Sequence, residues 1–491
     1  MKQVGLDMED VGVRAATAAR WSMATQVGQV LLQLGVQVAL ARLLGPETYG
    51  VFAIGLIVLT FTSFVSDFGF AWGLIQRSTL TDEDTRFVFT WQLLAGVLAA
   101  GVMFVAAPAI AVVVEDPRVV GVVRWLALAC VLASAATTSV NLLRRRLDFR
   151  RLGLIQISAY AVGYAGVGIP LAVAGTGVAA LVSAWLTQAA VTLVAAYAAC
   201  RHPLRPLFWY DGARAVGRHG AVVFMTNITN WLLNHLDRVV VARVLGASAA
   251  GVYTLGANLA LMPAGLLLNA LQPAFLASGA RLEGDLERLR RSYLQVLSTI
   301  AVLVAPAFVL LALLAPEIVA LLYGRAWEEA GQVLTWLALA MPLYVVWGMS
   351  TPVLWNSGRR RLEAGLQAPL LVAAALAMAW IAPRGAAAVA VVAAFVFLSR
   401  AIVIGTAACR AIAVPARDLA RLLASSAVLC VAVAAAGRVV LEILPAGVWP
   451  LLRPASAALA GMAAYAALGR LFPSLIGPEA RAMAARLRRR A

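Results

Sequence analysis

The chain alternates between long apolar runs and short segments that hold much of its proline, glycine and arginine. Many of these runs reach 18 residues, enough for an α-helix to cross the hydrocarbon core of a bilayer. We predict about fourteen transmembrane helices, most of them separated by turns marked with Pro or Gly. The predicted ranges are 17–40, 51–75, 88–113, 119–141, 153–174, 177–199, 219–242, 251–277, 293–314, 331–355, 364–382, 385–408, 421–441 and 448–469.

The seventh predicted span carries a stripe of polar side chains. Its members, at i, i+3, i+7 and i+11, are Asn227, Asn230, Asn234 and Arg238. At about 100° per residue these positions share one face of a helix, with Asp237 at its edge. A polar face on an otherwise apolar membrane helix is typical of a helix that lines a polar cavity.

The same stripe occurs 201 residues earlier, in the first predicted span, as Gln26, Gln29, Gln33 and Gln37. The segments that follow also match at this offset: residues 41–45 correspond to residues 242–246, and Gly50 corresponds to Gly251. A basic motif, Asn-x-x-Arg-Arg-Arg-Leu, follows both the fourth and the tenth span, at 141–147 and 356–362. A repeat of this length predicts a duplicated lobe, and both copies start on the same side of the membrane.

The repeat and the spans together predict the organisation of the chain. Residues 1–205 form an N-terminal lobe of helices 1–6, residues 206–409 a C-terminal lobe of helices 7–12, and residues 410–491 helices 13 and 14 with a basic tail. Composition agrees, because 62% of residues are hydrophobic and 13% are charged, against about 25% charged in soluble proteins. The expected fold is therefore an all-α polytopic membrane protein with two pseudo-symmetric six-helix lobes and two further helices.

The basic residues predict the orientation. The formal net charge is +17, from 39 arginines and one lysine against 23 acidic residues. With the N-terminus in the cytoplasm, cytoplasmic segments hold 30 of these cations and outer segments hold 8. This bias predicts a multi-pass protein of the cytoplasmic membrane with both termini cytoplasmic. The cations lie in short clusters between spans, which argues against nucleic acid as a partner and favours anionic membrane lipids.

The two stripes are the main candidate for a substrate-binding cavity, and Asn269 and Gln272 of the eighth span join them. That span also holds two prolines, which predict a kinked helix. The alternative is that these amides only hydrogen-bond neighbouring helices to one another. Two observations favour a cavity: four polar groups in a row exceed the needs of one packing contact, and the stripes occupy equivalent places in both lobes.

Charged residues in the spans raise further alternatives. Arg238 and Asp237 form either a local ion pair, with the arginine reaching the interface, or part of the cavity, where a guanidinium suits phosphate oxygens. Asp67 and Asp237 are candidates for ion or proton coupling, and a structural pair or helix cap is the alternative for Asp67. The sequence has no phosphate-loop, dinucleotide or metal-ligand motif, and its four cysteines lie far apart. We therefore predict no catalytic residue, no metal, no cofactor and no enzymatic activity.

Several stretches resemble the bacterial polysaccharide transporter family, the Wzx-type oligosaccharide flippases of the multidrug/oligosaccharidyl-lipid/polysaccharide exporter superfamily. The turn Gly-Pro-x-x-Tyr-Gly-x-Phe at 45–52 leads into a helix that ends in Asp-x-Gly and then Ile-Gln-Arg. The run that starts at Leu236-Asp237 and ends in Leu-Gly before Gly-x-Tyr is similar to the family's seventh-helix motif. The basic loop after the fourth span also matches, and the resemblance covers roughly residues 15–410.

The resemblance implies two six-helix bundles around a central cavity, lined by helices 1, 2, 7 and 8. It implies a substrate as well: an oligosaccharide on a polyprenyl pyrophosphate, turned from the inner to the outer leaflet for surface polysaccharide biosynthesis. The sugar needs amides and hydroxyls, and the pyrophosphate needs cations, for which Arg238 and Arg42 are the candidates. A protein with this role can also have the polysaccharide polymerase or the export machinery as a partner.

Two alternatives stay open at this point. The first is a lipid II flippase, or an exporter of small molecules or cations, on the same fold. The second is a membrane enzyme, a polysaccharide polymerase or ligase. The longest outer loop, around 315–330, is too short to build an outer catalytic domain, which argues against the enzyme.

Overall fold

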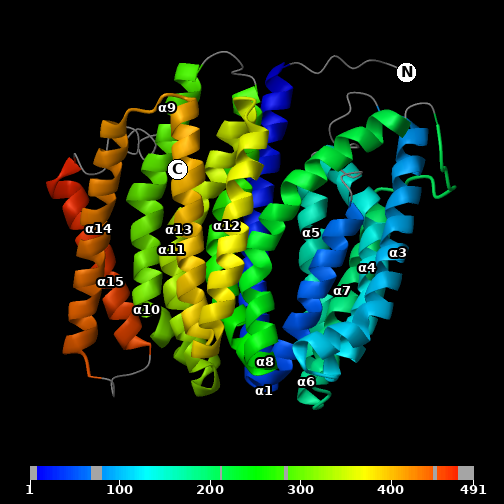
Figure 1. The fold of residues 1–491 in the computed structure, drawn as a ribbon, viewed down its shortest axis with the longest axis horizontal. Coiled ribbons are helices and arrows are strands. Elements are labelled where there is room, and N and C mark those ends of the chain that lie inside the picture. Colours follow the sequence, from blue (N-terminus) through cyan, green and yellow to red (C-terminus); the bar gives the residue numbers. More distant parts are fainter. Residues whose placement is uncertain are drawn as a thin grey trace. The chain divides into compact units, whose positions relative to one another are not determined.

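A computed structural model describes residues 8–67, 80–146, 148–210, 213–280, 286–445 and 451–473. Within these ranges, the side chains of 8–20, 65–67 and 213–227, among others, are not described. All regular structure in the described ranges is helical, as the apolar pattern predicts (Figure 1). The all-α fold class is therefore confirmed.

The described residues contain 11 helices that are long and apolar enough to cross a membrane. The predicted number of fourteen is not confirmed. One reason is that two long helices, α1 (Met8–Asp67) and α8 (Ala213–Ala280), each cover two of the predicted spans. A further predicted span coincides with α15 (Leu452–Leu471), which is outside those 11 helices.

The chain divides into two compact units. Unit 1 comprises Met1–Trp231 and Gly246–Gly251, and unit 2 comprises Leu232–Leu245 and Val252–Ala491. The lobe boundaries proposed from the repeat differ in detail from these units and stay a prediction.

In unit 1, α4 packs against α1, α3 and α7, and its buried face is made largely of small and branched apolar residues. Helix α5 contacts α1 and α7 as well. The helices of this unit that follow α1 are α3 (Asp82–Val114), α4 (Arg118–Arg145), α5 (Phe149–Tyr160), the π-helix η1 (Ala161–Gly168), α6 (Ile169–Val173) and α7 (Val178–Ala199).

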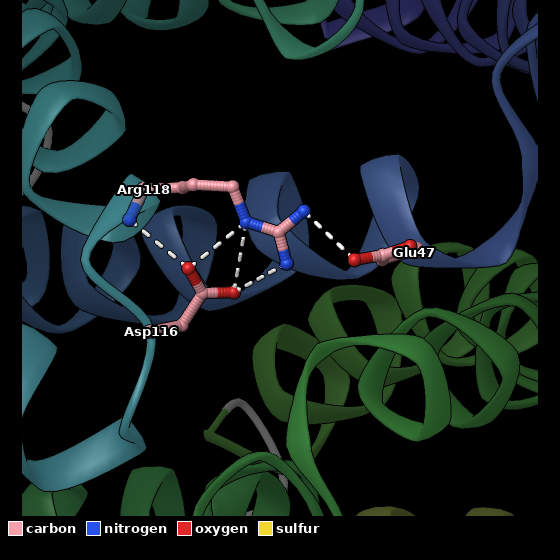
Figure 2. Close-up of polar contacts among 3 residues, drawn as sticks. All are labelled: Glu47, Asp116 and Arg118. Carbon is pink, nitrogen blue, oxygen red and sulfur yellow. Dashed lines mark hydrogen bonds and ion pairs between the residues drawn. The ribbon is translucent and has the colours of Figure 1, made fainter.

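An ion triad connects the α3–α4 turn to α1 (Figure 2). The Arg118 guanidinium donates to both oxygens of Asp116, at 3.0 Å from Nε to Oδ1 and 2.8 Å from Nη2 to Oδ2. Its Nη1 lies 2.8 Å from Oε1 of Glu47. These side-chain hydrogen bonds from Arg118 hold the pKa of Asp116 below its usual value. Since the Arg118 and Glu47 side chains are more than half exposed, we assign the triad a local bracing role and little net stability.

The segment between α7 and α8 is bound along α3, and we call residues 201–210 the connecting segment. Arg86 Nε donates to the carbonyl of Arg205 at 3.0 Å, and Trp91 Nε1 donates to the carbonyl of Phe208 at 3.1 Å. The backbone N–H of Leu207 donates to Thr90 Oγ1 at 2.9 Å, and the Tyr210 hydroxyl donates to Asp84. The segment that leads from α7 toward α8 is therefore attached to α3 at several points.

In unit 2, α11 packs against α10 and α13, and α12 packs against α13. Helices α14 and α15 lie side by side, and both contact α10 (Figure 1). The helices of this unit, apart from α8, are α9 (Leu286–Thr299), the π-helix η2 (Ile300–Val304), α10 (Ala305–Tyr323), η3 (Arg325–Trp327), α11 (Glu328–Asn356), α12 (Arg360–Ile381), η4 (Ala382–Arg384), α13 (Ala386–Ala411), α14 (Ala416–Ile443) and α15.

The repeat is visible in the backbone as a matched break in α1 and α8. Gly45 has φ 72° and ψ 172°, and Gly246, its counterpart in the repeat, has φ 78° and ψ −172°. A positive φ of this kind is readily adopted only by glycine. Each glycine thus breaks the long helix into two helical halves, one for each of two predicted spans.

The segments that follow the two breaks meet backbone to backbone, within unit 1. A Cβ added to Gly50 would lie 1.7 Å from the carbonyl oxygen of Ala247, and one added to Gly251 would lie 2.1 Å from that of Pro46. Pro46 and Gly50 are the repeat counterparts of Ala247 and Gly251. The contact is therefore self-complementary, as in a two-fold interface, and it has no room for a side chain at either glycine.

Candidate functional site

The stripe in the first half of α1 lies in unit 1. Gln26, Gln29 and Gln33 are half-buried, whereas Gln37 is buried at 6% exposure. Gln37 Nε2 has no hydrogen-bond partner among the described residues. An amide buried in this way costs free energy unless an acceptor is supplied. Whether this stripe faces a cavity stays a prediction.

The stripe on α8 is divided between the units. The side chain of Asn227 lies outside the described residues, and Asn230 is half-buried in unit 1. Asn234 and Arg238 belong to unit 2, where both are half-buried and both have side-chain partners. Arg238 Nη2 donates to Asn258 Oδ1 at 3.3 Å.

Asp237, at the edge of the stripe, is buried at 8% exposure. Its Oδ2 accepts a hydrogen bond from the Tyr253 hydroxyl at 2.7 Å, and its Oδ1 accepts one from the backbone N–H of Arg238 at 2.8 Å. These two hydrogen bonds satisfy both oxygens of the buried carboxyl group. The side chain of Asp67, the other candidate for ion coupling, lies outside the described residues. Ion coupling through either residue stays a prediction.

The remaining candidates are Gln272, Asn269 and Arg42, and their environments differ. Gln272 donates from Nε2 to the carbonyl of Gly348 on α11 at 3.0 Å. The NH₂ group of Gln272 therefore links α8 to α11. Asn269 and Arg42 are exposed. Among the described residues, no group of three or more His, Cys, Asp or Glu side chains could hold a metal ion.

The structure adds one residue that the candidate set omits. Arg400, on α13, has no exposed surface. Its Nη1 donates to Asn234 Oδ1 at 2.7 Å, and its Nε and Nη2 donate to Gln367 Oε1 on α12 at 3.2 and 3.0 Å. Its guanidinium carbon lies 3.6 Å from the centre of the Trp347 ring of α11. The side chain therefore joins α8, α11, α12 and α13 within unit 2.

Glu363, at the start of α12, supplies the opposite charge. It has no exposed surface and accepts from Thr351 Oγ1 at 2.9 Å, Trp355 Nε1 at 2.7 Å and Gln367 Nε2 at 3.0 Å. These three donors satisfy both oxygens of the buried carboxyl group. An arginine inside an apolar span indicates a functional site. This rule singles out Arg400 in the sequence, but nothing in the sequence identifies the partners of Arg400.

Comparison with known proteins is consistent with this architecture. The family described as polysaccharide biosynthesis protein matches residues 39–332. The lipopolysaccharide biosynthesis protein WzxC of Escherichia coli is 26% identical over 66% of this chain and 66% of its own length, just under two thirds. The succinoglycan biosynthesis transport protein ExoT of Rhizobium meliloti is 27% identical over 71% of each chain.

Solved structures share the fold. The lipid II flippase MurJ in an inward closed conformation has a TM-score of 0.65 at 11% identity, covering 94% of this chain and 98% of its own. An inward-facing multidrug resistance MATE family transporter of the MOP superfamily has a TM-score of 0.59 at 16% identity, covering 80% and 98%. The resemblance to Wzx-type and exporter-superfamily proteins is thus confirmed. Since the family match extends over more than half of the residues, the chain belongs to the polysaccharide biosynthesis protein family of membrane proteins with a transporter fold.

Proposed function

We propose that the protein is a flippase that moves a polyprenyl-pyrophosphate-linked oligosaccharide across the bacterial cytoplasmic membrane during surface polysaccharide biosynthesis. The observation that carries this proposal is the joint match of one chain to a polysaccharide biosynthesis family, through relatives such as WzxC and ExoT, and to a transporter fold over 94% of its length. No covalent step is part of the proposed mechanism.

The proposed mechanism is alternating access of a central cavity. The amides on α1 and α8 bind the sugar, with Gln33, Asn230 and Asn234 as the main contacts, and Arg238 binds the phosphate. Amides both donate and accept, which suits hydroxyl-rich sugars, whereas a guanidinium matches phosphate oxygens. Both termini lie in the cytoplasm, and the basic tail contacts anionic lipid.

The backbone contact at Gly50 and Gly251 supports a role in this cycle. Because two carbonyl oxygens lie where side chains would otherwise project, the segments after the two breaks can approach closely in this conformation. We propose that they close one end of the pathway and separate when the protein changes state.

A cell-based export assay tests the assignment. Arg238→Ala and Asn234→Ala should each reduce polysaccharide export at least about tenfold, because each removes a polar contact to the charged or hydroxylated substrate. Arg438→Ala and Asn141→Ala are matched controls, since Arg438 is exposed and Asn141 lies on α4. Wild-type export by Arg238→Ala and Asn234→Ala, at normal protein levels, would overturn the assignment.

Lipid II flipping is a second candidate, favoured by the fold match to MurJ. The two functions differ in the glycan and share the lipid pyrophosphate. Flipping assays with lipid II and with lipid-linked oligosaccharide, in parallel, separate them. We expect the oligosaccharide to be the preferred substrate, since WzxC and ExoT take their names from polysaccharide pathways.

A further inference from the structure

Arg400 reaches the candidate substrate stripe through one hydrogen bond, to the amide oxygen of Asn234 at 2.7 Å. We call Glu363, Gln367, Arg400 and Asn234 the Arg400 cluster, and all four lie in unit 2. Buried charges in a membrane-spanning bundle are costly and are retained where they serve a site. The question is therefore what this arginine does for Asn234.

The cluster is a directed chain of hydrogen bonds. Glu363, saturated by its three donors, fixes the NH₂ group of Gln367 toward itself. The Gln367 oxygen then faces Arg400 and accepts two of its N–H groups. A third N–H group of Arg400 goes to Asn234, and Trp347 covers the face of the guanidinium. Each link in this chain has one possible direction.

That direction determines how Asn234 meets its surroundings. An amide side chain can normally rotate by 180° and exchange its donor and acceptor. A guanidinium has no acceptor atom, so only the Asn234 oxygen can face Arg400. Asn234 is half-buried, and its NH₂ group is consequently directed away from Arg400. Asn234 acts on the stripe as a hydrogen-bond donor.

The next stripe position, one turn further along α8, has the same polarity. Arg238 can only donate, and its Nε is buried without an acceptor among the described residues. Tyr344 lies close enough to Arg238 and Arg400 to interact electrostatically with both. Asp237 already accepts from the Tyr253 hydroxyl and from the backbone N–H of Arg238, and Glu363 accepts from three other donors. This part of the stripe is therefore rich in donors and poor in free acceptors.

We propose that Arg400 is a positioning residue that locks the Asn234 amide as a donor, making Asn234 and Arg238 a donor-only subsite for the anionic oxygens of the substrate's pyrophosphate. This inference rests on the proposed function and refines it, since it assigns Asn234 to the pyrophosphate and leaves Gln33 and Asn230 as the main contacts to the sugar. The subsite favours acceptor-rich anions over cationic solutes, because Asn234 and Arg238 both present N–H groups to the ligand.

Asn234→Asp separates positioning from packing. The aspartate keeps the size of the side chain and pairs with Arg400, so the fold and thermal stability should be retained. It replaces the NH₂ donor with a second carboxylate oxygen that repels phosphate. We expect the affinity for undecaprenyl pyrophosphate in nanodiscs to fall at least about tenfold, as loss of a charge-assisted bond predicts. Wild-type affinity in Asn234→Asp would overturn the proposal.

Asn141→Asp is the matched control, since Asn141 is also a buried asparagine whose oxygen accepts from an arginine, Arg144, at 3.3 Å. It should bind undecaprenyl pyrophosphate as the wild type does. If the control and Asn234→Asp lose affinity equally, the effect is general and the proposal fails. Undecaprenol, which has no phosphate, should bind Asn234→Asp, Asn141→Asp and the wild type with equal affinity.

The role of Arg400 itself is tested in a charge-balanced background. The double variant Glu363→Gln/Arg400→Met removes both buried charges together, so neither is left uncompensated. Asn234 then keeps its donor but can rotate, and we expect affinity to fall about three- to tenfold from lost preorganisation. Unchanged affinity in a folded double variant would contradict a positioning role.

These outcomes distinguish the inference from the proposed function. If wild type neither binds undecaprenyl pyrophosphate nor flips lipid-linked oligosaccharide, the proposed function fails. If wild type does both and Asn234→Asp does both equally well, the function stands and the Arg400 inference fails.

Discussion

At the scale of single residues, buried polar groups in this protein are tied into directed networks. Arg400 is bonded on one side to Asn234 and on the other to Gln367, which in turn donates to Glu363. The two charges are joined through the amide of Gln367, and the Trp347 ring lies over the cation. Removing any one member leaves the others with unmatched partners in a low-dielectric interior.

Glu363→Gln tests how strongly the two charges depend on each other. The substitution removes the carboxylate that compensates Arg400, and we expect a loss of about 3 kcal/mol in the free energy of unfolding. Thermal unfolding in detergent measures it. The double variant Glu363→Gln/Arg400→Met should regain part of this loss. If the single variant is as stable as wild type, the charges are compensated by other groups.

His202, in the connecting segment, gives a pH-dependent signature outside the spans. It is buried beside the rings of Phe89 and Tyr197, and this burial lowers its pKa below the usual 6.5, partly offset by a bond to the Pro203 carbonyl. The unfolded chain then binds the proton more readily than the folded one. Its contribution is present above about pH 6.5 and is lost as pH falls through the window below it.

We therefore expect the unfolding temperature of the wild type to drop between pH 7 and pH 5 by more than that of His202→Phe. The difference between the two proteins isolates this histidine from other titrating groups. Parallel curves for the two proteins would show that His202 does not contribute.

At the scale of elements, α1 and α8 are each divided in two by a glycine with positive φ, and the halves after the breaks touch within unit 1. The contact depends on the absence of side chains at Gly50 and Gly251. The polar stripes lie in the halves before the breaks. In each long helix the polar stripe therefore precedes the break and the close backbone contact directly follows it.

Gly50→Ala tests this contact, because the added methyl group would meet the Ala247 carbonyl at 1.7 Å. We expect the segments to be forced apart and transport to fall at least about tenfold, with Gly251→Ala behaving alike. Gly35→Ala on α1 and Gly265→Ala on α8 are matched controls, since nothing lies within 4 Å of either position. They should keep wild-type transport, and alanine should favour the helix by about 1 kcal/mol. Full activity of Gly50→Ala would show that the contact is not needed.

At the scale of the whole molecule, much of the fold follows from sequence periodicity. The apolar runs predict the helices, and the segments that match at the offset of 201 residues contain the two breaks that the structure places at Gly45 and Gly246. Each of these signals is local or repeats along the chain. The predicted number of spans is not confirmed, since α1 and α8 each hold two predicted spans joined across a non-helical glycine.

The candidate site is predicted only in part. Asn234 and Arg238 are visible as a stripe because they share one helix. Arg400 lies 166 residues from Asn234 in the sequence, and no spacing rule joins them. Glu363 and Gln367 are one turn apart on α12, yet their relation to the stripe emerges only through Arg400. Packing of helices distant in sequence brings this cluster together.

Flipping of a defined lipid in liposomes tests the central claim most directly. The purified protein is reconstituted with fluorescent polyprenyl-pyrophosphate-linked oligosaccharide, and transfer is followed by quenching from outside. The account predicts transfer well above that of protein-free liposomes, lost in Arg238→Ala and kept in Arg438→Ala. Transfer no faster than in protein-free liposomes, or equal transfer by Arg238→Ala and wild type, would contradict it.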